Sequence, residues 1–269
     1  ASLALFQYLR RVRPDVVPEA RDVIFEIGLT PNRPDGLGHV GLAREAAALF
    51  GISCQPPAPE STLRRNDRAV ADDLDVRIDD ADRCPHYGAS IVSGATIAPS
   101  PPGVRWRLSA LGVRPISNAV DVTNVMMLEH GHPMHAFDAD KIRGGRIVVR
   151  RAKAGETLVT LDGVTRKLDA DDLVIADAEG PIALAGVMGG LSSEISASTQ
   201  RIVLECAYFD PRGVRRAARR HGLHSESSHR FERGIDHGDT ARALEDATGL
   251  ACRLTGGVAS ADSVLRVAR

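Results

Sequence analysis

Polar side chains interrupt an otherwise apolar helical run in the middle of this sequence. Asp121, Thr123 and Asn124 stand among valines and methionines, and His132 and His135 follow directly. Buried polar groups cost free energy unless they are hydrogen-bonded. A helix that carries three of them either holds a satisfied hydrogen-bond network or lines a site.

The two histidines favour a site. Pro133 places them in a loop just after the polar helix, so we expect His135 to point back at Thr123 and Asn124. A lone histidine is usually structural, but titratable groups beside other polar groups are typical of functional sites.

A carboxylate and a glycine cluster form a second candidate region. Glu205 lies in an apolar strand, where alternation predicts that it shares a face with Val203 and Ala207. There it either accepts a substrate hydroxyl or polarises a water, or it lies on a solvated sheet face; both readings stay open. Gly186 begins a cluster that ends at Gly190, which allows close approach of a ligand or forms a tight turn.

Arginines gather on one arc of a predicted helix, opposite Val214, Ala217 and Ala218. The five are Arg212, Arg215, Arg216, Arg219 and Arg220. A charge run is often a solvated face. Guanidinium groups match phosphate geometry, however, and no lysine or acidic residue interrupts the run, which favours binding of a nucleic-acid backbone.

Motifs for other chemistries do not occur. The polar segment 221–234 lacks the ligand spacing of a metal site, and the sequence contains neither a P-loop nor a nucleophile elbow. We therefore expect no metal and no covalent serine nucleophile.

Composition indicates a globular cytoplasmic protein. The 269 residues are 43% hydrophobic and 26% charged, with a net charge of −1. The four cysteines form no C-x-x-C pair, which is typical of a reducing compartment. No apolar run approaches the roughly 20 residues of a membrane helix, so we expect no membrane partner.

The elements alternate between helix and strand. We expect helices over 39–50, 102–111 and 239–254, together with the polar helix, which begins at the N-cap Asn118 and ends at Gly131. We expect strands over 23–27, 74–79, 87–97, 146–150, 157–161, 173–176, 182–185 and 202–206, and we expect Asp162-Gly163 to join 157–161 to 165–168 in a hairpin.

These elements predict an α+β (mixed α/β) fold, a layered mixed sheet with helices. We expect a small N-terminal α/β piece over 1–56, a linker over 57–73, where proline and charge accumulate, and a larger domain over 74–269.

Several motifs recur together in a fixed order over roughly residues 20–269. They are TPNRPD at 30–35 with GLARE at 41–45, RPISN at 114–118 with DVTN at 121–124, PMHAFD at 133–138, TLDG at 160–163, AGVMGG at 185–190, LE at 204–205 and SHRFERG at 228–234. As a set they resemble the β subunit of bacterial phenylalanyl-tRNA synthetase.

The resemblance covers the end of that family's small N-terminal domain and its central editing module. Its oligonucleotide-binding, pseudo-catalytic and anticodon-recognition domains have no counterpart here, which implies a fragment or a truncated relative. The chain alone is not expected to aminoacylate. The aminoacylation site, with its ATP and Mg²⁺, belongs to the α subunit, so no cofactor is expected in this module. Implied partners are tRNA and, for the full protein, the α subunit in an α2β2 heterotetramer.

The resemblance implies hydrolysis of tyrosine mischarged onto the phenylalanine tRNA. A phenylalanine pocket rejects an added hydroxyl poorly, so a second site must recognise that hydroxyl. Glu205 would accept it, and His135, Thr123 and Asn124 would position the terminal ribose and a water. Implied substrate-binding residues are Arg114, Gly186, Ser225 and Ser227; we add Arg212, Arg216, Arg219 and Arg220 as RNA-binding residues.

Two departures touch the pocket wall: Ser225 stands where threonine is common, and Ser227 where alanine is common. Asp121 gains no role in the resemblance, and we expect it to be a buried structural hydrogen-bonder. Two alternatives stay open. One is a non-catalytic tRNA-binding or assembly module that is active only in the full heterotetramer. The other is a stand-alone trans-editing protein.

Overall fold

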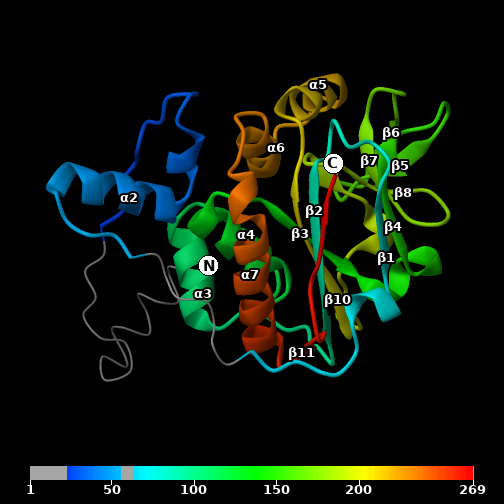
Figure 1. The fold of residues 1–269 in the computed structure, drawn as a ribbon, viewed down its shortest axis with the longest axis horizontal. Helices are drawn as coiled ribbons and strands as arrows, with labels where there is room; N and C mark the ends of the chain where they lie inside the picture. Colours follow the sequence, from blue (N-terminus) through cyan, green and yellow to red (C-terminus); the bar gives the residue numbers. More distant parts are fainter. Residues whose placement is uncertain (1–22, 56–62, 269) are drawn as a thin grey trace.

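Two five-stranded sheets, packed face to face, frame the part of the chain that the computed structural model describes, residues 23–55 and 63–268 (Figure 1). The central sheet has the order β11-β2-β10-β3, and β12 also pairs with β2. Its strands are β2 His86–Ser93, β3 Met134–Asp138, β10 Arg201–Tyr208, β11 Val258–Ala259 and β12 Val264–Val267.

The outer sheet has the order β1-β4-β7-β8-β9, with a parallel β1–β4 pair and antiparallel pairs elsewhere. Its strands are β1 Asp75–Ile78, β4 Arg146–Arg151, β7 Leu173–Ala176, β8 Pro181–Leu184 and β9 Met188–Gly189. A separate hairpin pairs β5 Thr157–Val159 with β6 Thr165–Lys167 through the predicted turn, where Gly163 has φ +78°.

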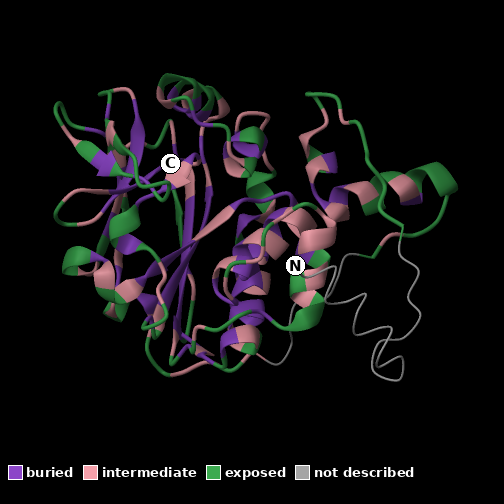
Figure 2. Cartoon of the chain, turned by 180° about the vertical axis from the view of Figure 1, so that it is seen from behind, coloured by how far each residue is buried: buried purple, intermediate pink, exposed green. Residues whose placement is uncertain are grey.

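Helices cover the other face of the central sheet. The polar helix α4 (Val120–His130) and the C-terminal α7 (Thr240–Thr255) share one apolar cluster with Leu204 and Cys206 of β10. The central sheet is therefore buried on both faces, and Figure 2 shows buried residues running along its strands. The other α-helices of the described residues are α2 His39–Phe50, α3 Pro102–Ala110, α5 Pro211–His221 and α6 Glu226–Phe231. The predicted α+β class, with layered sheets and helices, is confirmed.

Short 3₁₀ turns connect several elements: Pro34–Leu37, Val70–Asp72, Ala139–Lys141, Arg143–Gly145, Leu191–Ser193 and His237–Asp239. In the described part of the chain, no helix has both the length and the apolar character needed to cross a membrane.

The N-terminal region agrees with the sequence only in part. Helix α2 has the predicted bounds and ends at Gly51, which adopts the left-handed conformation at φ +64°. The strand predicted over 23–27 is wrong: these residues pair with no strand among the described residues, and Phe25 is 78% exposed. A strand needs a neighbour for its backbone groups, and alternation alone does not supply one.

The predicted linker needs a correction. Residues 57–62 lie outside the described residues, whereas 63–73 pack against the large domain. Arg65 bridges to Ala259, its guanidinium donates to the Ser260 carbonyl at 2.9 Å, and Val70 is fully buried. A linker is therefore wrong for 63–73, and the division into domains stays a prediction.

Polar residues around α4 anchor its start. Asn118 is not the predicted N-cap, because α4 begins at Val120; its amide instead donates to the carbonyls of Thr96 and Leu254 at 2.9 Å. Asp121 is fully buried and accepts from the Ser100 hydroxyl at 2.6 Å and the Ile116 N–H at 2.8 Å. Its expected structural role is confirmed.

We predict that Asp121→Ala lowers the free energy of unfolding by roughly 2 to 3 kcal/mol, because it leaves the buried Ser100 hydroxyl and a backbone N–H without an acceptor. Urea denaturation of both proteins measures the change. Asp67→Ala, at an exposed position, is the control and should change stability by less than about 0.5 kcal/mol. Equal effects of the two substitutions would contradict the anchoring role.

Candidate functional site

A cavity of about 210 Å³ lies between the two sheets, beside the glycine cluster. Most of its lining is apolar, and the polar contributions come from a few side chains. The lining residues are Pro133, Met134, His135, Leu161, Ile175, Ala183, Leu184, Gly186, Val187, Met188, Gly189, Glu205, Ser225, Ser227 and Phe231. The structure thus brings together five of the predicted site residues from four separate parts of the sequence.

Glu205 is the carboxyl of this cavity. It lies in β10, the strand between β2 and β3, and its residue is only 5% exposed. Among the described residues its Oε2 atom has no partner with regular hydrogen-bond geometry. Burial raises the pKa of Glu205 to about 8, and the nearby Tyr87 hydroxyl offsets part of that rise. The solvated-face reading is therefore wrong, and the carboxyl is protonated at neutral pH.

His135 lies directly opposite Glu205 in the antiparallel β3–β10 pair. Cross-strand partners have Cβ atoms about 5 Å apart, so the two side chains are neighbours. The imidazole packs edge-on against Phe137, with ring centroids 4.4 Å apart. Burial lowers the pKa of His135 to about 4, and its buried Nε2 lacks a partner among the described residues. At neutral pH the imidazole is uncharged.

The orientation predicted for His135 is wrong. Its ring points between the sheets toward Gly189, whereas α4 covers the opposite face of the central sheet. His132 is the structural histidine of the pair: it is buried, and its Nε2 lies 3.1 Å from the Ala207 carbonyl oxygen. The two histidines therefore have different environments: His132 lies in the loop before β3 and bonds to a backbone carbonyl, whereas His135 lies within β3 and faces the outer sheet.

Glycines let the backbone approach the cavity. Gly186 has φ +70°, and a Cβ there would lie 2.9 Å from Val214 of α5. At Gly189 a Cβ would lie 2.3 Å from the His135 ring. A side chain at either position would displace the cavity wall. These glycines are therefore needed for close packing at the cavity as well as for the turn.

Ser225 and Ser227 hydrogen-bond to the backbone of the cavity wall. The Ser227 hydroxyl donates to the Gly186 carbonyl at 3.0 Å, and the Ser225 hydroxyl donates to the Val187 carbonyl at 2.8 Å. Ser225 also caps α6 by accepting from the Ser228 N–H at 3.0 Å. Both hydroxyls are committed to backbone groups, and they shape the cavity rather than offer a free nucleophile.

Three predicted residues do not line the cavity. The Thr123 hydroxyl donates to the Val120 carbonyl within α4 at 2.7 Å, and Asn124 lies on the same helix. Arg114 is exposed on the loop before α4. A resemblance of motifs gives no three-dimensional distance, and none of these three residues is among those that line the cavity with Glu205 and His135.

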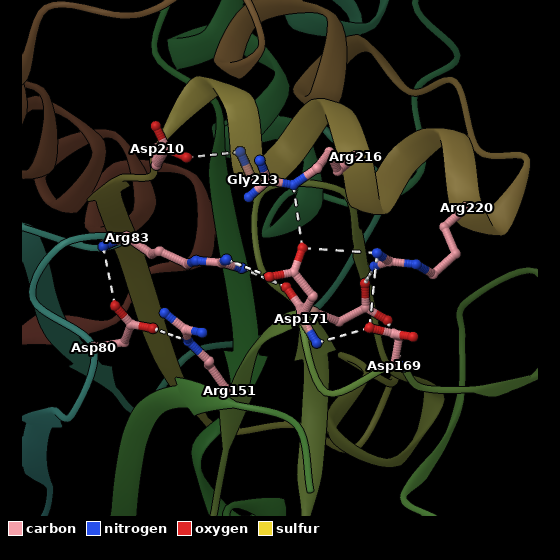
Figure 3. A network of polar contacts seen from close by, with 10 residues as sticks. Asp80, Arg83, Arg151, Asp169, Asp171, Asp210, Gly213, Arg216 and Arg220 are labelled. Atoms are coloured by element: carbon pink, nitrogen blue, oxygen red, sulfur yellow. Dashed lines mark hydrogen bonds and ion pairs between the residues drawn. The ribbon is translucent and has the colours of Figure 1, made fainter. Parts of the chain in front are cut away.

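The arginines of α5 divide into two groups. Arg216 pairs with Asp171 at 3.1 Å (Figure 3). Arg220 pairs with the fully buried Asp172, to which His221 also bonds at 2.7 Å. Asp171 holds Arg83 as well. By contrast, Arg212, Arg215 and Arg219 are exposed, and within the described residues no ion pair is formed by them. The predicted separation of a charged and an apolar helix face is confirmed.

Tyr87 is the residue of this region that the sequence did not single out. It is fully buried in β2, with its hydroxyl near Glu205, and it looked like an ordinary strand aromatic. Only the pairing of β2 with β10 places it there, and no spacing in the sequence reports that pairing.

Comparison with known proteins gives consistent likenesses. The B3/4 domain family model matches residues 83–256. The phenylalanine–tRNA ligase β subunit of Anaeromyxobacter dehalogenans is 52% identical over 248 residues, a match that covers 92% of this chain and 31% of the relative. That of Geobacter metallireducens is 51% identical over 240 residues, which cover 88% and 29%. The chain thus spans about a third of the length of these curated relatives.

A crystal structure titled as an N-terminal fragment of the phenylalanyl-tRNA synthetase β subunit from Pyrococcus horikoshii is also similar. Its TM-score is 0.49 at 16% identity, with 96% of this chain and 73% of that chain covered. At this level the likeness adds nothing to the sequence matches.

We predict that Glu205→Gln flattens the pH dependence of stability between pH 6.5 and 8. The native state keeps a proton on Glu205 up to its pKa of about 8, whereas the unfolded chain has lost it above the ordinary value of 4.5. The wild type therefore loses stability as pH rises through this window, by roughly 1.5 kcal/mol, and the neutral amide does not.

Urea denaturation of both proteins at pH 6.5 and 8 measures the difference, and groups common to both cancel. His135 also contributes, because its ordinary pKa of 6.5 lies at the lower end of the window, but it is present in both proteins and its contribution cancels in the comparison. Parallel pH profiles for the two proteins would show that Glu205 titrates normally.

Proposed function

Because the chain carries a B3/4 domain and belongs to the phenylalanine–tRNA ligase β-subunit family, we propose that it is an editing module of such a ligase. It binds charged tRNA and hydrolyses the ester of tyrosine mischarged onto the phenylalanine tRNA. In the full ligase it works with an α subunit, which carries out aminoacylation.

The buried carboxyl in an apolar cavity supports this proposal most strongly. A tyrosine side chain is an apolar ring with one polar tip, and the cavity offers apolar walls with Glu205 among them. A tyrosine hydroxyl hydrogen-bonds to the carboxyl, whereas a phenylalanine ring leaves the cavity-facing oxygen of that carboxyl without a partner. A site built for a hydroxyl discriminates strongly against the analogue that lacks it.

The hydrolytic step relies on orientation. The hydroxyls of Ser225 and Ser227 already donate to backbone carbonyls, so neither is set up as a nucleophile. A water attacks the ester carbonyl, with help from the neighbouring ribose hydroxyl, and the tRNA 3′ end leaves as the alcohol. His135, uncharged at neutral pH, exchanges hydrogen bonds with the water or ribose at the cavity wall.

One observation favours the alternative of a module that is active only in the full heterotetramer. Thr123 and Asn124, expected near the ribose, and Arg114, expected to bind the substrate, do not line the cavity. If tRNA or the α subunit must bring α4 and the cavity together, the isolated chain binds tRNA without turnover.

The tRNA backbone binds along α5. Arg212, Arg215 and Arg219 recur at helical spacing on an exposed face, whereas Arg216 and Arg220 have aspartate partners. Phosphate contacts therefore fall to the first group. This revises the RNA-binding set by adding Arg215 and removing the two paired arginines.

We predict that Glu205→Ala reduces the preference for deacylating tyrosyl- over phenylalanyl-tRNA by roughly 10- to 100-fold, because the substrate hydroxyl loses its partner. Single-turnover deacylation of both substrates measures the ratio. Glu194→Ala, at an exposed position, is the matched control and should leave the ratio unchanged. An unchanged ratio in Glu205→Ala would contradict hydroxyl recognition. Turnover by the heterotetramer but not by the folded chain would favour the alternative.

We also predict that replacing Arg212, Arg215 and Arg219 together by glutamine weakens tRNA binding and lowers the slope of log affinity against log salt by about 2 to 3, since each lost phosphate contact removes nearly one unit. Filter binding over a salt series measures the slope. The Arg216→Gln, Arg220→Gln double variant, checked for folding by circular dichroism, should keep the wild-type slope. Equal changes in both variants would contradict the division of α5.

A further inference from the structure

Unpartnered buried polar atoms cluster on one face of the central sheet. Among the described residues, four buried side-chain N or O atoms lack a regular hydrogen-bond partner. Three of them belong to Tyr87, His135 and Glu205, while the fourth is the Ser263 hydroxyl between β11 and β12. Buried polar atoms are nearly always paired, so three orphans on adjacent strands indicate a site rather than chance.

Strand register places Tyr87 beside Glu205. In the antiparallel β2–β10 pair, Tyr87 lies opposite Ala207, and Ala89 lies opposite Glu205. Tyr87 is thus the diagonal neighbour of Glu205 on the same face, within reach of a long aromatic side chain. It is fully buried and does not line the cavity, so it stands behind the carboxyl as seen from the substrate.

The Tyr87 hydroxyl is suited to act as a permanent donor. Burial, together with the neighbouring Glu205, raises the pKa of Tyr87 well above its ordinary value, so the proton stays on the phenol. The hydroxyl lies close enough to lower the pKa of Glu205, although their geometry falls short of a regular hydrogen bond.

We propose that Tyr87 is a positioning residue for hydroxyl recognition: its phenol donates to one oxygen of the Glu205 carboxyl and keeps the other oxygen directed into the cavity. This inference rests on the proposed editing function. Because the carboxyl is already held in one orientation, it loses no rotamer freedom when the tyrosine hydroxyl binds. Preorganisation therefore lowers the entropic cost of binding. Tyr87 acts through Glu205 and does not touch the substrate.

The test is Tyr87→Phe, which removes the hydroxyl and keeps the ring. We expect the pKa of Glu205 to rise by roughly half a unit to one unit, because the carboxylate loses a donor. Carbon-13 NMR of the glutamate carboxyl groups across a pH series measures it, with the Glu205→Gln spectrum identifying the resonance. Tyr208→Phe is the control, because Tyr208 lies on the same sheet but has the opposite parity along β10.

Deacylation provides the second measurement. We expect Tyr87→Phe to lower kcat/KM for tyrosyl-tRNA about tenfold and to leave phenylalanyl-tRNA unchanged. In the double variant with Glu205→Gln, the loss should equal that of Glu205→Gln alone, because both act through one carboxyl.

The outcomes separate the two proposals. A shifted Glu205 pKa without any deacylation in the wild-type heterotetramer would uphold the contact and overturn the editing function. Deacylation that retains its tyrosine preference in Tyr87→Phe, with an unshifted pKa, would overturn the role of Tyr87. Additive losses in the double variant would also overturn it, because Tyr87 would then act independently of Glu205.

Discussion

The burial of one carboxyl in the middle of a two-sided sheet is the constraint on which the rest of this structure depends. Strand β10 is covered by helices on one face and by the outer sheet on the other, so valine, leucine, cysteine and alanine suit it. Glu205 does not, because a charge there loses its hydration without gaining a cation. The protein keeps the carboxyl protonated at neutral pH and sets it at the wall of a cavity.

The cavity keeps its shape because glycines allow the backbone of its wall to pack closely against its neighbours, where a side chain would not fit. Gly186 lets the chain turn against Val214 of α5, and Gly189 lets the outer sheet close over His135. Helix α5 is in turn fixed by the aspartates that precede β7, through Arg216 and Arg220. The ion-pair network in Figure 3 therefore holds α5 beside the cavity and neutralises the charges of Arg216 and Arg220.

The buried polar residues at the start of helix α4 have structural roles. Asp121 and Asn118 form hydrogen bonds that attach neighbouring loops to the helices, as their burial requires. Glu205, His135 and Tyr87 instead retain unpartnered atoms around one point. Whether a buried polar side chain has all its hydrogen-bond partners thus distinguishes structural from candidate site residues better than the residue type does. A buried polar atom without a partner is costly unless a ligand supplies that partner.

The sequence alone determined the family, the mixed α+β class and most element bounds, and it singled out Glu205, His135 and Gly186, which line one cavity, because periodicity and motif order are local properties of the chain. It placed a strand at 23–27 and aimed His135 at Thr123, since it could not say which strands pair. The tertiary structure decided those points. Register put Tyr87, Glu205 and His135 on one buried face, and the aspartates at 169–172 divided the arginines of α5. Contacts between distant segments follow from packing, which no short pattern encodes.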